Sequence, residues 1–587
     1  MKYNLNELTR NQQKSSNLRS LNKLLAMIRE ERPTMLLALG AIVINSTLNL
    51  LGPFIIGHVI DTYVVEKDYS GVVRWAAILL GMYLVAFVAN YLQTVMMGGV
   101  GQRMLFKLRN TIFNKLQELP LAFFGENKAG DLISRVNNDS DKINQFFSQS
   151  LMQFIGTLVT MTGAGIFLLS INYKLGIATL LPGLVIFIFT RIISPWVKNK
   201  NAVSMQRTGG LSAEIQESLQ NFKVIIAFNR RDYFRNRFEQ ANKENYDAAL
   251  IAGIANNIFL PVYGLFAAVA QLIVLLVGIY LISEQQFTIG LLVSYLAYAV
   301  NFYNPLRQIA ALWANFQAAM ASWDRISHML NLESNLLPVP ATEAVSVEET
   351  VMEFRDVSFG YDENKEILHH INFAMLRGKT YALVGPTGGG KTTTASLIAR
   401  LYDPTRGTVL LDGKDIRSYS PEERTNKIGF ILQEPILFSG TVGENIAYGN
   451  SNPRYNDPDQ LREIIREAGL DRILGTFENG LETPIGPGGD NISLGQKQLI
   501  AFMRAVLRNP EILILDEATA NIDTITEQIL QEILDHLPKK TTMVIIAHRL
   551  NTIQNADEIY FVNAGEMIRA GSFDHAVDML LHNKRSS

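Results

Sequence analysis

Residues 385–392 read Gly-Pro-Thr-Gly-Gly-Gly-Lys-Thr, which matches the phosphate-binding pattern G-x-x-x-x-G-K-[ST]. The apolar residues 380–384 before it predict a buried strand, and residues 392–401 predict the helix that follows. Glycines let backbone N–H groups close around phosphate oxygens, and the start of a helix adds partial positive charge. We therefore expect Lys391 to reach the β- and γ-phosphates of a nucleotide and the Thr392 hydroxyl to bind Mg²⁺.

A second stretch of sequence predicts a strand that ends in two acidic residues. Residues 511–517 read Glu-Ile-Leu-Ile-Leu-Asp-Glu, and such an apolar run is typical of a parallel strand buried on both faces. Ligands of α/β sheets bind at the carboxyl ends of the strands. This position predicts that Asp516 holds Mg²⁺, directly or through water, and that Glu517 accepts a proton from attacking water.

Further motifs surround these two in a fixed order. Phe359-Gly-Tyr361 precedes the phosphate loop, and residues 431–435 (Ile-Leu-Gln-Glu-Pro) follow it. Residues 491–498 (Asn-Ile-Ser-Leu-Gly-Gln-Lys-Gln) precede the acids, and residues 547–550 (Ala-His-Arg-Leu) come after them. As a set, these motifs resemble those of the ATP-binding cassette (ABC). The whole chain resembles a half-transporter of the ABC exporter family, most closely one subunit of a bacterial heterodimeric multidrug exporter.

The resemblance implies a role for each matching position. Tyr361 would stack on adenine, Gln433 would sense Mg²⁺ and water, and His548 would contact the γ-phosphate. The signature-motif residues would close over ATP held by the other cassette of a dimer. The implied ATP-binding residues are Tyr361, Gly385, Pro386, Thr387, Gly388, Gly389, Gly390, Lys391, Thr392, Thr393, Ser493, Gly495, Gln496 and Asp523; the implied catalytic residues are Glu517, His548 and Gln433; the implied Mg²⁺ ligands are Thr392, Gln433 and Asp516.

The signature motif departs from the family pattern L-S-G-G-Q. Leu494 stands where the first glycine belongs, and Ile492 replaces the leucine. Each ATP site in the family combines one chain's phosphate loop and acids with the other chain's signature motif. A homodimer would carry the altered motif in both sites, so the sequence favours a heterodimer whose partner has an intact signature. The alternative is that Leu494 points away from the nucleotide and is tolerated.

Charged residues make up 18% of the 587 residues, fewer than the roughly 25% of soluble proteins, and they are unevenly spread. A bilayer core about 30 Å thick needs about 20 mostly apolar helical residues. We therefore predict six membrane spans, the fourth continuing past Arg191 to Val197. The windows without Asp, Glu, Lys or Arg are 33–60, 75–102, 145–173, 175–190, 248–283 and 285–306.

The distribution of basic residues predicts the orientation. Seven Lys and Arg precede the first span, seven lie in 103–142 and nine in 198–243, which indicates that these segments are cytoplasmic. We expect an integral protein of the bacterial inner membrane, with the N-terminus and the cassette in the cytoplasm. The amphipathic stretch 17–32 predicts an interfacial helix. The resemblance also implies transverse helices in the two long loops, near Phe123–Ala129 and Thr208–Glu214.

The predicted fold is thus an α-helical membrane domain followed by an α/β P-loop cassette. We place the membrane domain at 1–330, a Pro- and Glu-rich linker at 331–350 and the cassette at 351–587. The absence of cysteine excludes disulfides, thiol nucleophiles and Cys-ligated metals. A net charge of −2 gives no basic excess for binding nucleic acid.

The prediction of the cargo rests on the composition of the spans. The spans contain amides and aromatics but no carboxylate or ammonium deep inside, which suits hydrophobic or amphipathic compounds better than ion coupling. Helix–helix hydrogen bonding explains any single amide equally well. The resemblance implies export of such compounds, multidrug fashion, by alternating access driven by ATP with Mg²⁺. A homodimeric lipid flippase of the same fold, and an ATP-gated channel or regulator, are the alternatives.

Overall fold

The structure is a computed structural model. It describes residues 3–5, 29–334, 336, 338–340, 349–362, 365–450, 452–516, 524–535, 537–538, 540–546, 554–571 and 573–582. The chain divides into two compact units. One comprises Leu5–Gln117 and Ala129–Asn331, and the other comprises Met1–Asn4, Glu118–Lys128 and Leu332–Ser587. Most of the predicted interfacial helix, and much of the predicted linker, lie outside the described residues.

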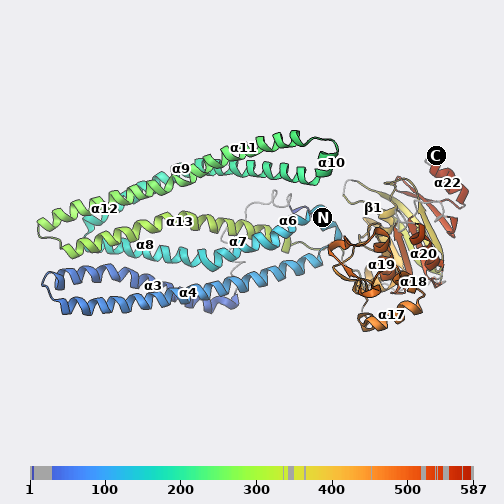
Figure 1. Ribbon diagram of the computed structural model, residues 1–587, viewed down its shortest axis with the longest axis horizontal. Helices are drawn as coiled ribbons and strands as arrows, with labels where there is room; N and C mark the ends of the chain where they lie inside the picture. Colours follow the sequence, from blue (N-terminus) through green and yellow to red (C-terminus); the bar gives the residue numbers. More distant parts are fainter. Residues whose placement is uncertain are drawn as a thin grey trace. The chain divides into compact units, whose positions relative to one another are not determined.

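The first unit consists of long helices that run side by side (Figure 1). Within the described residues, five helical stretches are long and apolar enough to cross a membrane: Arg29–Val64, Tyr69–Glu118, Ala129–Ile171, Tyr173–Gln220 and Arg231–Ser283. The sixth predicted span falls on a further long helix, α13, which is more polar. The main helices are α3 (Arg32–Val59), α4 (Tyr69–Glu118), α8 (Leu151–Ile171), α9 (Tyr173–Gln220), α11 (Arg231–Asn257), α12 (Phe259–Ser283) and α13 (Ile289–Leu330).

Helix α13 is the hub of this unit, because its polar side chains bind backbone carbonyls of three neighbouring helices. Polar groups at membrane depth must be satisfied inside the protein, and here each hydroxyl has a partner. Two of the acceptors lie three residues before a proline inside a continuous helix, Pro53 in α3 and Pro182 in α9. The bonds run from Tyr295 to Leu168 (2.5 Å), from Tyr298 to Leu50 (2.7 Å), from Tyr303 to Thr179 (2.6 Å) and from Ser294 to Pro53 (2.7 Å).

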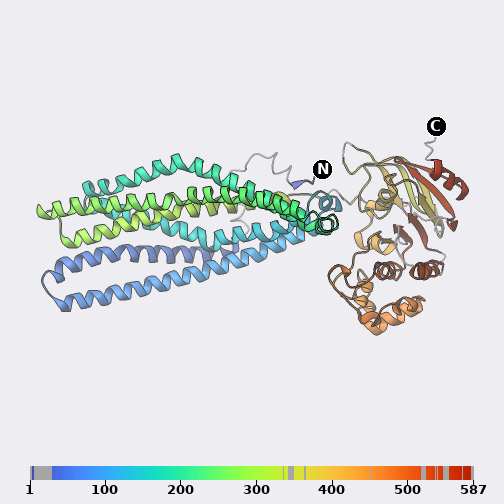
Figure 2. The ribbon, with the colours of Figure 1, turned by 45° about the horizontal axis from the view of Figure 1, so that its top comes forward.

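Helix α12 lies beside the N-terminal half of α9, and helices α9 and α11 lie side by side along the C-terminal half of α9 (Figures 1 and 2). Cross-helix contacts hold them together: Asn201 with Asn256 at 2.8 Å, Thr208 with Asn245 at 2.8 Å, Arg207 with Glu244, and Arg237 with Glu214 at 2.7 Å. At their far end the chain turns through the short helix α10 (Phe222–Ala227).

The transverse helix expected near Thr208–Glu214 is therefore misplaced, because that segment continues α9. Each glycine costs a helix about 1 kcal/mol, but pairing with α11 keeps α9 continuous through Gly209 and Gly210. A Cβ at either glycine would meet nothing within 4 Å, so neither is there for close packing. The first loop holds a short helix, α5 (Leu121–Glu126), which overlaps the segment expected near Phe123–Ala129.

The second unit contains an antiparallel sheet and a mostly parallel one. The antiparallel sheet has the order β2-β1-β4-β5. The larger sheet has the order β12-β11-β3-β10-β9-β6, in which only β12 runs antiparallel to its neighbour. The strands are β1 (Thr350–Phe359), β2 (Leu368–Leu376), β3 (Thr380–Val384), β4 (Arg406–Leu411), β5 (Lys414–Asp415), β6 (Ile428–Ile431), β9 (Ile512–Asp516), β10 (Thr542–Ile546), β11 (Glu558–Asn563) and β12 (Glu566–Arg569).

Two hydrophobic cores support these sheets. Strand β9 is buried at every position, as expected of a parallel strand covered on both faces. The helices nearest to the predicted site are α14 (Lys391–Ile398), α16 (Val442–Ala447) and α19 (Leu494–Val506). The other helices are α15 (Pro421–Lys427), α17 (Pro458–Glu467), α18 (Asp471–Leu474), α20 (Thr524–Asp535) and α22 (Phe573–His582).

Candidate nucleotide site

The phosphate loop connects strand β3 to helix α14, as predicted. Gly385 and Gly390 have φ angles of +145° and +115°, which side chains rarely adopt. A Cβ at Gly385 would also collide with the Val562 carbonyl of β11, so the loop needs glycine there. Backbone N–H groups can thus approach phosphate oxygens closely at the start of α14.

Lys391 is the first residue of α14, and its side chain folds back over the loop. It is 5% exposed, and its ammonium donates to the carbonyls of Gly385 at 2.9 Å and Pro386 at 3.0 Å. These bonds place a positive charge within the loop, where the β- and γ-phosphates of a nucleotide would lie. Thr392 is exposed in the first turn of the same helix.

Strand register brings the acid to the same edge of the sheet. Ile546 of β10 pairs with Leu383 of β3 on one side and with Asp516 of β9 on the other. Asp516 is 3% exposed at the carboxyl end of β9. Because all three strands are parallel, the phosphate loop and Asp516 emerge at one end of the sheet. Glu517, Asp523 and His548 lie outside the described residues, although Glu517 directly follows β9 in sequence.

The donor set around this edge fits Mg²⁺ bound together with a nucleotide. Mg²⁺ is usually held by one or two protein oxygens plus substrate phosphates. Thr392 offers a hydroxyl and Asp516 a carboxylate, both hard oxygen donors. Among the described residues there is no group of three or more His, Asp or Glu that could hold a metal by itself.

Tyr361 is positioned by other aromatic side chains. Its ring meets Phe359 and Tyr402 edge-on, with centroids 5.0 and 5.1 Å away, and 49% of its surface stays exposed. Its hydroxyl lies 3.2 Å from the hydroxyl of Thr393, which is 6% exposed in α14. Burial raises the pKa of Tyr402, with a smaller contribution from Tyr361. Tyr361 is thereby attached to the helix that carries Lys391.

Replacing Tyr361 with alanine should weaken ATP binding by about 1–3 kcal/mol, judged from base–aromatic stacking in other systems. The rate at saturating ATP should change little, because adenine is remote from the bond that breaks. Titration with a fluorescent ATP analogue measures the affinity. Tyr361→Phe is the matched control, since it keeps the ring and loses only the contact with Thr393. Equal affinities for Tyr361→Ala and the unaltered protein would remove Tyr361 from the site.

The signature residues lie at the start of α19. The Ser493 hydroxyl accepts from the Gln496 N–H at 3.2 Å, and the Gln496 side chain accepts from the Ser493 N–H at 3.0 Å, which together form a capping box. Gln496 also donates to the Thr476 carbonyl at 2.9 Å. Within the described part of the chain, no hydrogen bond joins these residues to the phosphate loop. Leu494 is 41% exposed in the first helical position.

Gln433 is exposed two residues beyond β6, at the same sheet edge as Asp516. The sequence motifs do not include Arg504 of α19, which binds the backbone of the segment that follows Gln433. Arg504 donates to the carbonyls of Ile436 (3.1 Å) and Asn445 (2.8 Å), and its guanidinium lies 5.2 Å from the Tyr448 ring centroid. Burial lowers the pKa of Arg504. An arginine in a helix carries no sequence signal of this role.

Comparison with known proteins gives two family matches and several similar proteins. Residues 35–306 match the family model of the ABC transporter transmembrane region, and residues 368–520 match the ABC transporter model. An uncharacterized ABC transporter ATP-binding protein of Bacillus subtilis, YfiC, is 33% identical over 95% of this chain and 92% of its own length.

Two further relatives carry more specific names. A fatty acid ABC transporter ATP-binding/permease protein of Mycobacterium bovis is 33% identical over 86% of this chain and 79% of its own. A probable multidrug resistance ABC transporter of B. subtilis, YheH, is 31% identical over 87% of this chain and 75% of its own. The solved structure of a bacterial Atm1-family ABC exporter with ATP bound shares the fold, with a TM-score of 0.78, 24% identity and coverage of 95% and 99%.

Proposed function

Because the chain belongs to the ABC transporter family, we propose that it is one half of a heterodimeric exporter of hydrophobic or amphipathic compounds. The family match shows an integral membrane protein whose ABC ATPase drives export. The heterodimer, the class of cargo, the bacterial inner membrane and the role of each site residue belong to the proposal. The observation that carries the heterodimer is the exposed Leu494 at the start of α19.

At the ATP site, the chain's residues bind and position rather than form covalent bonds. Lys391 and the backbone of the phosphate loop hold the β- and γ-phosphates, and Tyr361 stacks on adenine. Thr392, Gln433 and Asp516 would hold Mg²⁺, which neutralises charge on the phosphates. Glu517 accepts the proton of the attacking water, and His548 contacts the γ-phosphate.

Leu494 makes the two sites of the dimer unequal. A glycine at this place lets the helix start approach a nucleotide closely, whereas a leucine adds bulk and restricts φ and ψ. The capping box keeps the helix start intact, so the expected defect is steric and local. The site that uses this chain's Glu517 would take its signature motif from the partner. The other site, closed by Ser493, Leu494 and Gly495, would hold ATP without rapid turnover.

Replacing Leu494 with glycine should shorten the lifetime of ATP trapped in the poor site, because the steric obstacle is removed. The measurement is nucleotide retained per dimer after rapid gel filtration of the purified complex. Glu422→Gly is a matched control, since it also puts a glycine at an exposed position in the first turn of a helix of the same unit, α15. Retention that is identical in Leu494→Gly and the unaltered protein would show that Leu494 points away from the nucleotide.

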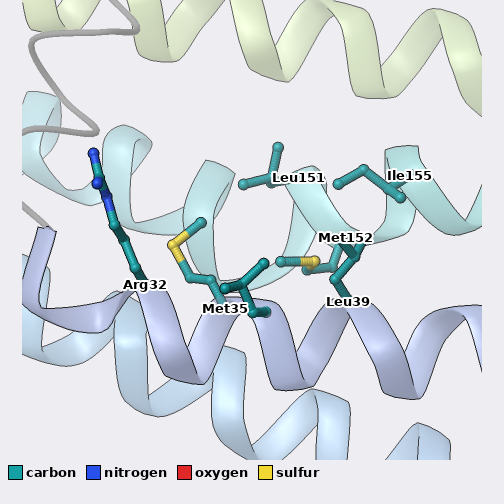
Figure 3. A pocket seen from close by; sticks show the side chains of 7 residues that line it. Arg32, Met35, Leu39, Leu151, Met152 and Ile155 are labelled. Atoms are coloured by element: carbon teal, nitrogen blue, oxygen red, sulfur yellow. The ribbon is translucent and has the colours of Figure 1, made fainter.

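Two apolar cavities between α3 and α8 support the proposed cargo. One has a volume of about 300 Å³ and is lined by Met35, Leu36, Leu39, Leu151, Met152 and Ile155, with Arg32 at one end (Figure 3). The other is about 510 Å³ and is lined by Thr47, Leu50, Leu51, Leu158, Val159, Thr162, Gly163, Ile166 and Phe167. Mostly apolar walls with a few polar groups are typical of small-molecule sites.

The names of the two better-described relatives fit compounds of this class, a fatty acid in one and drugs in the other. Purified protein in vesicles should therefore show higher ATPase activity with amphipathic aromatic compounds, and labelled compound should accumulate on the side opposite the cassette. Stimulation by lipid but not by such compounds would favour the flippase instead. ATP binding without hydrolysis would favour the channel or regulator.

We propose that the short loop helices, α5 and α10, transmit the conformational effect of cargo binding to the cassettes. Helix α10 and its end expose four apolar side chains, Phe222 (54%), Val224 (54%), Ile226 (43%) and Phe228 (74%), a patch suited to docking on another surface. In the first loop, Phe124 of α5 is 43% exposed. Cargo changes hydrolysis only by favouring one conformation, so a physical link of this kind is required.

Replacing Phe124 and Phe228 together with serine should lower stimulation by cargo severalfold and leave nucleotide binding unchanged. The reason is that both docking surfaces lose apolar area while the nucleotide site keeps every contact. ATPase rates with and without compound give the stimulation ratio, and an ATP titration gives the affinity. Tyr173→Ser, which replaces an exposed aromatic at the first position of α9, serves as the control. Full stimulation in the double variant would require another route.

A further inference from the structure

Tyr3 contacts two elements that are far from it in sequence. It is 1% exposed, and its hydroxyl donates to the backbone carbonyl of Glu333 at 3.0 Å, just beyond the end of α13. Its ring meets the ring of Phe123 in α5 edge-on, with centroids 6.4 Å apart. The segments that contain these three residues belong to the same compact unit, together with the cassette.

Asn127 completes this contact from the α5 side. It follows the last residue of α5 and is 7% exposed. Its side-chain nitrogen donates to the carbonyl of Phe123 at 2.8 Å and to the carbonyl of Tyr3 at 2.8 Å. An amide group has two N–H donors, so both are used here, one to close the helix end and one to bind Tyr3.

Helix α5 depends on such contacts for its position. It has six residues, Leu121–Glu126, and isolated helices of that length are not stable in water. Its one buried side chain is Phe123, which is fully covered and touches the Tyr3 ring. The ring of Tyr3 therefore packs on the only core residue of α5, while its hydroxyl binds the chain that leaves α13.

We propose that Tyr3 is a strap that fastens α5 to the segment following α13, so that the first intracellular loop and the connection to the cassette move together. A relative shift of the two would break either the hydroxyl bond to Glu333 or the ring contact and the Asn127 bond, which join Tyr3 to α5. Tyr3 acts as a positioning residue: it determines how fully a movement of the segment after α13 is transmitted to α5. Its loss should reduce coupling between cargo and hydrolysis and leave the ATP site unaltered.

The absence of cysteine allows a direct test, because two introduced cysteines are the only labels in the chain. Gly125→Cys and Glu333→Cys carry the spin labels. A Cβ at Gly125 meets nothing within 4 Å, and the Glu333 carbonyl that accepts from Tyr3 belongs to the backbone and is kept. Pulsed electron paramagnetic resonance then gives the distance distribution between α5 and the segment after α13.

Tyr3→Ala should broaden that distribution, and Tyr3→Phe, which keeps the ring and loses the hydroxyl bond, should broaden it less. Tyr69→Ala removes a tyrosine that is 83% exposed in α4 and should leave the distribution unchanged. In vesicles of phosphatidylethanolamine and phosphatidylglycerol, Tyr3→Ala should lower the ratio of ethidium-stimulated to basal ATPase at least twofold. The affinity for ATP should stay the same.

Identical distance distributions in Tyr3→Ala and the unaltered protein would overturn the strap. A broadened distribution with an unchanged stimulation ratio would overturn its role in coupling. If the unaltered protein does not respond to ethidium, the proposed cargo class fails, and the distance measurement still decides whether Tyr3 holds α5. Elution of every variant at the dimer position in gel filtration separates these outcomes from misfolding.

Discussion

Replacing Glu517 with glutamine is expected to lower ATP turnover at least about 100-fold and to leave ATP binding intact. The change removes the proton acceptor and keeps the size and hydrogen-bonding capacity of the side chain. The groups that hold the nucleotide, Lys391 with the phosphate loop and Asp516 at the end of β9, are untouched. Steady-state phosphate release gives the turnover, and a filter-binding titration gives the affinity.

Glu478→Gln is the matched control, because it makes the same chemical change at an exposed position of the same unit. It should retain the full rate. If Glu517→Gln kept half of the unaltered rate, Glu517 would not be the general base. The strong expectation rests on its place in sequence, directly after a strand whose last residue is a buried aspartate.

Replacing Lys391 with alanine is expected to lower ATP affinity as well as turnover, unlike the Glu517 variant, which should lose only turnover. The ammonium lies within the phosphate loop and would neutralise charge that the nucleotide already carries in the ground state. Hydrogen bonds to charged groups contribute about 1.5–3 kcal/mol to binding, so their loss should increase the dissociation constant for ATP roughly 10- to 150-fold. Calorimetric titration with ATP measures it directly.

Lys540→Ala removes an exposed lysine of the same unit and should bind ATP normally. An unchanged affinity in Lys391→Ala would contradict the placement of the phosphates. Comparing Lys391→Ala with Glu517→Gln also separates binding from chemistry, because the first variant should be deficient in both and the second only in turnover.

The sequence predicted the parts of the fold that depend on strong local signals. Charge-free windows of 16 to 36 residues mark the long helices. The glycines of the phosphate loop mark a connection in which the structure has positive φ angles at Gly385 and Gly390. The order of strands around that loop follows the α/β pattern. These features are encoded within a few residues of one another, so one sequence suffices to find them.

Features that depend on partners distant in sequence were missed. The transverse helix was predicted near Thr208–Glu214, but the chain turns later, at α10. The segment Thr208–Glu214 continues α9, because α9 pairs with side chains of α11, which is distant in sequence. Helix α13 binds its neighbours through hydroxyl groups that donate to backbone carbonyls. Because every residue has a backbone carbonyl, the sequence of the accepting helix does not reveal these bonds. Helix α13 therefore reads as one more span.

In the site, too, the local motifs were predicted and the tertiary contacts were not. The phosphate loop and Asp516 were found from motifs, and strand register brings them to one sheet edge. The contact of Tyr361 with Thr393 and the hold of Arg504 on the segment after Gln433 depend on tertiary packing, so the motifs gave no sign of them. The predictions for Glu517, Asp523 and His548 stay predictions, as they fall outside the described residues.

The central claim is that this chain works beside a different chain, and the composition of the native assembly tests it most directly. The chain is tagged and expressed at its native level, solubilised in detergent, purified and weighed by native mass spectrometry, with ATPase activity measured on the same sample. We predict one copy of this chain with one copy of a second, different ABC half-transporter. A stable dimer of two copies of this chain that hydrolyses ATP at two equal sites would contradict the claim.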